Sequence, residues 1–256
     1  MRNVVIVWAL LAAAVLSASQ GELGKAVAER DHVDALRHYR LGQDALHSEH
    51  LDIAEREFQA AARLDPTLEL APYGLGQVYM ALKQYRQAIA AYTKCGEVIR
   101  GNAALVAGDE IAYQRRIDDS IKALEDELHL YSGPGRTANT PAAQANIRNI
   151  ETRIRAMKDA KHRAIGGPPA PTPAWLSLAL GSAYFRTDAL PDAEREYRAA
   201  IAVDPKLGEA HNNLAVVYVT TRRYSEADAE IRAAEKAGFR VNPQLKEDVK
   251  KALPPR

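Results

Sequence analysis

Few side chains in this sequence have the types and spacing that catalysis or metal binding requires. His47, Glu49 and His50 lie close together, and imidazole and carboxylate groups are common metal ligands, but polar residues are equally usual in a turn between helices. The lone cysteine, Cys95, has no second thiol with which to complete a redox cycle. The sequence also has no Gly-rich phosphate loop, no HExxH and no GxSxG. We therefore predict no catalytic residues, no metal and no cofactor.

The composition is that of an ordinary globular protein. Of the 256 residues, 47% are hydrophobic and 26% are charged. Ala, Leu, Glu, Arg and Lys are frequent and the apolar residues recur with a helical period, which predicts an all-α fold. The chain has 34 basic and 33 acidic residues, so it lacks the basic surface of a nucleic-acid-binding protein. We expect no nucleic-acid partner.

Residues 1–19 have the pattern of a signal peptide. Arg2 precedes an apolar run from Val4 to Leu16, which is too short for a comfortable membrane span, and small residues at 17–19 suit cleavage. An uncleaved N-terminal anchor is the alternative. The segment predicts a periplasmic or secreted protein with no stable membrane insertion after cleavage. Residues 20–34 follow as a polar lead-in.

The main pattern is a 34-residue unit that occurs four times, in gapless pairs at 35–102 and 174–241. Position 7 holds a large residue, and position 11 is aromatic in the second, third and fourth copies. Positions 8 and 20 are small, because two helices cross closely there. Position 24 is bulky and position 27 is small. The third copy has the full set: Leu180, Gly181, Tyr184, Ala193, Tyr197, Ala200 and Pro205. The proline ends the second helix, whereas Arg100 takes its place in the second copy and predicts a longer helix.

These units resemble the tetratricopeptide repeat (TPR), and the chain resembles an exported bacterial TPR protein with an inserted helical hairpin. The resemblance implies an all-α fold: a short TPR α-solenoid of four repeats in two pairs, interrupted by a long antiparallel hairpin and closed by a C-terminal capping helix. Residues 242–256 would form this helix and a tail, because Leu245, Val249 and Ala252 share one apolar face.

Residues 103–165, between the two pairs of repeats, have a different period. Their apolar residues are spaced alternately four and three apart, which predicts two long helices packed along a coiled-coil-like seam. The seam residues are Ile117, Ile121, Leu124, Leu128 and Tyr131, then Ala143, Ile147, Ile150, Ile154 and Met157. Gly and Pro residues at 133–135 separate the two helices.

The first of these helices is mostly acidic and the second mostly basic, which favours an antiparallel hairpin. Folding the segment about its loop predicts Asp118 and Asp119 near Arg153 and Arg155. The hairpin would either project from the solenoid or lie along its groove. Residues 166–173 form a Pro- and Gly-rich linker that leads back into the repeats.

The TPR resemblance implies that positions 2, 5, 9, 12 and 13 of each repeat line a concave face. This lining is rich in aromatic and aliphatic anchors and in amides that can pair with a peptide backbone. The residues that we expect to bind a partner are Tyr39, Gln43, Tyr73, Gln77, Met80, Trp175, Leu178, Phe185 and Asn212. The alternative is that they pack within the chain, against a hairpin that lies in the groove.

These patterns lead to a functional hypothesis: a non-catalytic interaction scaffold or adaptor of the cell envelope, which binds a partner helix or peptide on its concave face. One alternative is a structural homo-oligomer, assembled through the hairpin with the groove filled by the chain itself. Another is an accessory subunit of an envelope enzyme. The identity of the partner is not encoded in any motif that we recognise.

Overall fold

The computed structural model describes residues 28–105, 110–132, 140–161 and 172–253. These residues form helices and no strands, which confirms the all-α prediction for them. A first helix at 28–47 precedes α2 (Leu51–Leu64), α3 (Leu70–Ala81), α4 (Tyr85–Leu105), α5 (Glu110–Ser132), α6 (Pro141–Lys161), α7 (Ala174–Arg186), α8 (Leu190–Val203), α9 (Gly208–Thr220), α10 (Tyr224–Lys236) and α11 (Pro243–Ala252). The predicted signal peptide, 1–19, lies outside the described residues. Within them, no helix combines the length and apolar character needed to cross a membrane.

The turn inside each repeat has the same backbone geometry. Glu49, Lys83, Asp188 and Arg222 have φ angles of 61°, 60°, 61° and 59°, and each is residue 15 of its repeat. This left-handed conformation destabilises a non-glycine residue by about 1 kcal/mol. Its presence at the same position of all four repeats therefore indicates one common type of turn. The four-fold register read from the sequence is therefore repeated in the backbone.

Close helix crossings explain the small residue at position 8. A Cβ added to Gly181 would lie 2.6 Å from the ring of Tyr197, which occupies position 24. In the fourth repeat position 8 is Ala215, and its counterpart at position 24 is the smaller Ile231. The glycine–ring contact recurs between Gly42 and Phe58 and between Gly76 and Tyr92. The ring at position 24 thus requires glycine opposite it.

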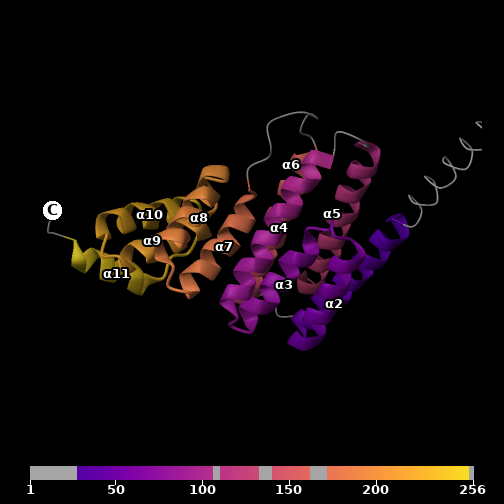
Figure 1. Cartoon of the computed structure of the whole chain (residues 1–256). Helices are drawn as coiled ribbons and strands as arrows, with labels where there is room; N and C mark the ends of the chain where they lie inside the picture. The colour runs from indigo at the N-terminus through magenta and orange to yellow at the C-terminus, as the bar shows by residue number, and fades with distance from the viewer. Residues whose placement is uncertain (1–27, 106–109, 133–139, 162–171, 254–256) are drawn as a thin grey trace, which may run out of the picture.

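The repeats form one continuous stack despite the insertion. Helix α4 packs directly against α7, although the whole of α5 and α6 lies between them in the sequence (Figure 1). One apolar cluster crosses this junction and joins Tyr92 and Cys95 of α4 to Leu176 and Leu180 of α7. As Arg100 predicted, α4 extends to Leu105. The hairpin is therefore looped out of the stack and does not divide it.

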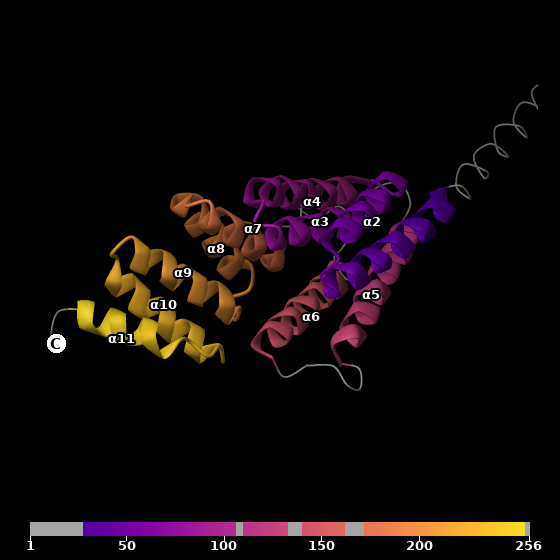
Figure 2. The same cartoon turned by 90° about the horizontal axis from the view of Figure 1, so that it is seen from below.

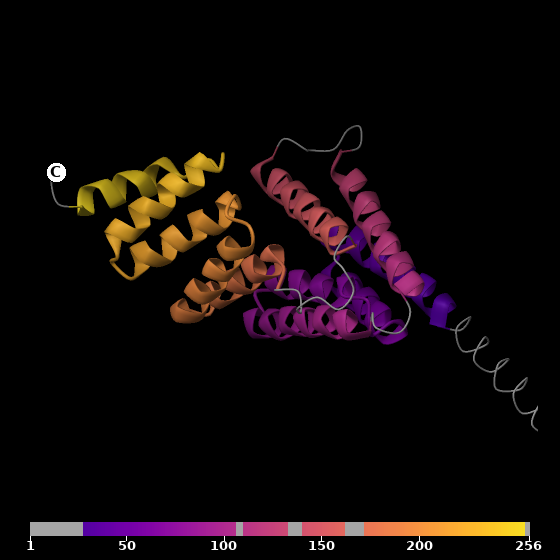
Figure 3. The ribbon, with the colours of Figure 1, turned by 90° about the horizontal axis from the view of Figure 1, so that it is seen from above.

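The hairpin lies against the stack, on the opposite side of α3 from α4 (Figures 2 and 3). Helix α5 runs beside the first helix, and α6 crosses toward α7. The hairpin seam residues Leu124 of α5 and Ile150 of α6 are buried in the same cluster as Leu36 and Tyr39 of the first repeat. The seam thus packs against the solenoid as well as between the two hairpin helices.

The antiparallel arrangement is as expected, but the predicted register is wrong. Asp118 pairs with Lys161 at 2.6 Å, and Glu127, not Asp118 or Asp119, lies 3.8 Å from Arg153. The helices are shifted by roughly two turns from the register that folding about the loop predicts. In the observed register, Arg153 is buried against Tyr39 of the first repeat, a contact that folding about the loop does not consider.

Helix α11 covers the end of the last repeat. Val249 is buried, and Leu245 and Leu253 pack against the same apolar cluster as α9 and α10. Asn242 caps the helix by accepting a hydrogen bond from the backbone of Gln244, and proline follows at the first helical position. This arrangement matches the capping helix expected from the sequence.

Candidate functional site

The residues expected to bind a partner fall into two groups. The larger group is buried, and its members are Tyr39, Gln43, Tyr73, Trp175 and Leu178. The smaller group is partly exposed, and its members are Gln77, Met80, Phe185 and Asn212. The hairpin accounts for part of this division, because Tyr39, Tyr73 and Trp175 contact its helices. Gln77 and Met80 of the second repeat nevertheless stay partly exposed. Partner binding by the buried group stays a prediction.

Arg153 of α6 lies at the centre of the covered groove and is 0% exposed. Its Nη2 donates to the hydroxyl of Tyr39 at 3.3 Å, and its Nη1 lies 3.8 Å from Glu127 of α5. The Tyr39 hydroxyl donates to Glu127 at 2.7 Å and accepts from Gln43 at 2.7 Å. The Tyr39 hydroxyl therefore bonds to both members of a buried ion pair, and Gln43 bonds to that hydroxyl in turn. Among the described residues, Nε and Nη1 of Arg153 have no hydrogen-bond partner.

The guanidinium of Arg153 also contacts the aromatic side chains of the next two repeats. Its central carbon lies 4.2 Å from the ring centre of Tyr73 and 5.6 Å from that of Trp175. The two rings meet edge to face, with centres 4.9 Å apart. The Tyr73 hydroxyl donates to Asn149 of α6 at 3.1 Å. One arginine thus contacts three repeats, the first through a hydrogen bond to Tyr39 and the next two through cation–π contacts.

Burial dominates the electrostatics of this cluster. It raises the pKa of Tyr73 to about 12 and raises the pKa of Tyr39, where the nearby charge of Glu127 adds to the effect. Burial also raises the pKa of Glu127, against the opposing influence of Arg153. The charge of Arg153 thus opposes the effect of burial, and losing it would remove the cation that compensates the Glu127 carboxylate. This arrangement is suited to holding the hairpin in place.

A second polar contact joins α5 to the first helix, nearer to the start of α5. His32 of the first helix is buried, and its Nδ1 donates to Asp65 at 2.5 Å. Its Nε2 lies 3.6 Å from Asp119 of α5. Burial alone would raise the pKa of Asp65, but hydrogen bonds from His32 and Thr67 lower it to about 2. No local pattern in the sequence links His32 to Asp65, 33 positions away, so this contact was not predicted.

A stretch of the concave lining in repeats three and four remains partly exposed. It combines the aromatic ring of Phe185 and the amide of Asn212 with Val216 and Val219. Glu209 of α9 is affected by α6, because Arg148 opposes the rise that burial produces in the pKa of this carboxyl. The open lining consists of Ser182, Phe185, Arg186, Asn212, Val216, Val219 and Thr220. We call it the open groove.

The histidines and the cysteine that were considered for metal or redox chemistry lie in a turn and in the core, respectively. His47 and His50 lie at the end of the first helix and the start of α2, and the His47 ring meets Tyr131 edge to face at 4.5 Å. Within the described part of the chain, no cluster of three or more His, Cys, Asp or Glu residues could hold a metal. Cys95 is buried, and burial raises the pKa of its thiol well above the usual value.

Comparison with known families identifies one repeat directly. Residues 73–99 match the tetratricopeptide repeat family. The chain contains a tetratricopeptide repeat. This match covers α3 from Tyr73 and most of α4. The other three repeats have the same left-handed residue in the turn between their two helices.

Several solved TPR structures resemble the chain at low sequence identity. PilW, a widely conserved type IV pilus biogenesis factor, is 16% identical, with 85% of each chain covered and a TM-score of 0.40. YrrB, described as a TPR protein with an unusual peptide-binding site, is 18% identical, covers 89% of this chain and 97% of its own, and has a TM-score of 0.29. TTC0263 of Thermus thermophilus is 20% identical, with 85% and 98% covered and a TM-score of 0.29. A search of curated proteins found no match. All three TM-scores are below 0.5, so the functional argument rests on this chain's own geometry.

Proposed function

We propose that the protein is a non-catalytic scaffold for protein–protein interaction, and that it binds a partner helix or extended peptide in the open groove. The observation that carries the proposal is the unequal cover of the concave face. The hairpin buries Tyr39, Tyr73 and Trp175, while Phe185 and Asn212 keep partly exposed side chains. The TPR fold supports the general class, since its stacked helices present a continuous concave surface.

The chemistry of the open groove suits a peptide. Phe185 supplies an aromatic anchor, and Val216 and Val219 extend the apolar surface. The amide of Asn212 can donate to and accept from a peptide backbone. Its Nδ2 now donates to the side chain of Asn213 at 3.2 Å, a partly exposed bond that a ligand could replace.

The proposed location is the cell envelope or the exterior, and it is supported by the sequence of residues 1–19 alone. N-terminal sequencing of protein recovered from the cell envelope tests it. We expect the mature chain to begin near Gln20. Recovery of a chain that starts at Met1 from the soluble cell interior would contradict the proposal.

The binding proposal is tested by comparing partners captured from envelope extracts by three forms of the protein. Phe185→Ala with Asn212→Ala alters the open groove, whereas Leu41→Ala removes an exposed leucine from the first helix as a matched control. We expect a protein captured by wild type and by the control to be lost from the double variant, with all three equally folded by circular dichroism. Identical captured proteins in all three would refute binding at this groove.

Alanine substitutions at Tyr39, Tyr73 or Trp175 would not test partner binding. These side chains hold the hairpin, so their loss would expose buried groups and destabilise the fold. Substitutions at these positions therefore test how the hairpin is held.

The homo-oligomer alternative requires the hairpin to pair between chains. Ile121, Leu124, Ile150 and Ile154 are already buried against the chain's own first repeat. Pairing through this seam would first have to remove the hairpin from the groove and break the Arg153–Glu127 ion pair. We therefore expect light scattering of the mature protein to show a mass that is independent of concentration.

A further inference from the structure

Helix α6 lies on the concave face of the repeats as a bound helix would, and crosses toward α7 (Figure 3). Its buried residues recur at positions i, i+3, i+4 and i+7 and form one stripe along the helix. The stripe consists of Ile150, Arg153, Ile154 and Met157. The apolar members pack in the same cluster as the first repeat, and the guanidinium lies against the rings of Tyr73 and Trp175. This part of the concave face therefore accepts one arginine among aliphatic side chains.

The stack of repeats is complete without α6. Helix α4 packs directly against α7, and the buried residues of the cluster that joins them come from α3, α4 and α7. Removing α6 would uncover this cluster at Tyr73 and Trp175 but would break none of the contacts between α4 and α7. The concave face can therefore keep its shape when α6 is replaced by another helix.

Helix α5 is held to the first helix by contacts of its own. Nε2 of His32 lies 3.6 Å from a carboxylate oxygen of Asp119, and Nε of Arg40 lies 3.6 Å from one of Asp126. Neither contact involves α6. Helix α5 can therefore remain as one wall of the groove when α6 is displaced.

The face of α5 that meets α6 is acidic. Three ion pairs join the two helices: Asp118–Lys161, Glu125–Lys158 and Glu127–Arg153, with N–O distances of 2.6, 3.2 and 3.8 Å. The first two are partly exposed and contribute little to stability. All three have the carboxylate on α5, so the wall of the groove favours a basic helix over an acidic one.

Helix α6 leaves polar atoms of this site without partners. Nε and Nη1 of Arg153 and the indole Nε1 of Trp175 are buried, and they have no hydrogen-bond acceptor among the described residues. An unpaired buried donor destabilises the docked arrangement, because the group has lost its bond to water. A helix that brings an acceptor to these donors would bind the site better than α6 does.

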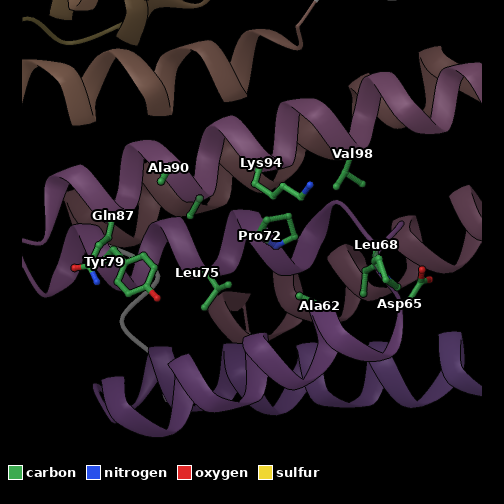
Figure 4. A pocket seen from close by; sticks show the side chains of 12 residues that line it. Ala62, Asp65, Leu68, Pro72, Leu75, Tyr79, Gln87, Ala90, Lys94 and Val98 are labelled. Carbon is green, nitrogen blue, oxygen red and sulfur yellow. The ribbon is translucent and has the colours of Figure 1, made fainter.

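An apolar hollow elsewhere in the first two repeats does not show the same selectivity for charge. It has a volume of about 370 Å³ and lies between α2 and α4, over α3 (Figure 4). Its charged lining residues, Asp65 and Lys94, have opposite signs, and Lys94 pairs with Glu97 at 3.2 Å. The covered groove beside α5 is therefore the surface whose chemistry specifies an occupant.

We propose that α6 is an intramolecular ligand, and that a basic amphipathic helix of a partner protein, with an arginine among aliphatic residues, displaces it from the concave face. The partner's arginine would pair with Glu127 and lie against Tyr73 and Trp175. A tethered segment competes at an effective concentration of about millimolar, so α6 excludes helices that bind less well. The site is separate from the open groove, and the proposal does not rest on peptide binding there.

The test measures binding of a labelled synthetic peptide, with the sequence of residues 141–161, to the full chain by fluorescence anisotropy. The peptide should bind an Arg153→Met chain at least about tenfold more tightly than the wild-type chain, because the competing α6 is weakened. Arg155→Met alters an exposed arginine of the same helix, and this chain should bind the peptide as wild type does. Equal binding by the wild-type and Arg153→Met chains would overturn the proposal.

Variants of the peptide identify what the site recognises. Arg153→Lys in the peptide keeps the charge but removes the planar guanidinium, and should weaken binding to the Arg153→Met chain about tenfold. Lys158→Glu with Lys161→Glu should also weaken binding, since like charges would then face the carboxylates of α5. Arg155→Met in the peptide should leave binding unchanged. Equal binding of all these peptides would contradict the recognition of arginine and of basic charge.

Hydrogen exchange of the wild-type chain tests release of α6 without any variant. The amides of α6 should exchange at least about tenfold faster than those of α3 and α7, because α6 can leave while the stack stays folded. Equal protection of the three helices would mean that α6 leaves only when the protein unfolds, and would overturn the proposal. So would a wild-type dimer in light scattering that the free peptide dissociates, since the displacing helix would then be α6 of a second copy.

Discussion

Replacing Arg153 by methionine should destabilise the protein by about 3–5 kcal/mol at neutral pH, which is the usual cost of removing one partner from a buried ion pair. Methionine fills a similar volume but leaves Glu127 buried and 5% exposed, with only the Tyr39 hydroxyl as a partner. The variant also loses the stacking on Tyr73. For a chain of this size the thermal midpoint should fall by roughly 10 °C.

The pH dependence separates lost charge from lost packing. The folded-state pKa of Glu127 is already raised by burial, and without Arg153 it should rise further. A group with a raised folded-state pKa favours folding below its unfolded pKa, and this contribution is lost as the pH rises through the folded-state pKa. The destabilisation by Arg153→Met should therefore be smallest near pH 4.5 and grow toward pH 8.

The measurement is urea unfolding followed by circular dichroism, with hydrogen exchange of α5 and α6 to locate the loss. Arg155→Met is the matched control, because Arg155 lies on the same helix and is exposed. Adding Glu127→Gln to Arg153→Met should recover most of the stability at neutral pH. A loss below about 1 kcal/mol, or one that does not vary with pH, would refute the reasoning.

Three further predictions concern the repeats. Gly76→Ala should destabilise the protein by about 1–3 kcal/mol, because the added methyl group would overlap the Tyr92 ring. Gly101→Ala has open space around the added methyl group and should stabilise α4 by about 0.5–1 kcal/mol. Thermal unfolding of both variants measures the two effects. Asp65→Asn should lower the free energy of unfolding by about 2 kcal/mol at pH 7 and by about half of this at pH 3. The reason is the lowered pKa of Asp65, because the stability that the ionised carboxylate contributes is lost as the pH falls through this pKa. Urea unfolding at the two pH values tests this, and an equal loss of stability at both would contradict it. The Cys95 thiol should react with a disulfide reagent only as fast as the protein unfolds, and rapid reaction of the folded protein would show that the buried environment is wrong.

Much of the solenoid could be read from the sequence because its packing follows local rules. A glycine at position 8 and a ring at position 24 identify a helix crossing within one 34-residue unit, as with Gly181 and Tyr197. Tyr39, Tyr73 and Trp175, which the repeat pattern places at equivalent concave positions, all contact Arg153. Each of these inferences depends on contacts within a repeat or between neighbouring repeats.

What covers the concave face could not be read from the sequence. The apolar seam of residues 117–157 shows that the two inserted helices must bury one side, but a seam does not specify what packs against it. In the observed register Arg153 contacts Tyr39 and Tyr73, and Tyr39 is 114 residues away in the sequence. The position of His32 beside Asp65 and Asp119 is likewise a contact between distant segments.

The sequence by itself determined the helices, the repeat register and the general class of function, because these depend on short-range periodicity and on the size of side chains at close crossings. The tertiary structure decided which surfaces remain open. It buried five of the nine residues expected to bind a partner, and Tyr39, Tyr73 and Trp175 among them contact α5 or α6. Exposure depends on every segment that packs nearby, so only the folded chain could show which part of a repeat surface is free to bind.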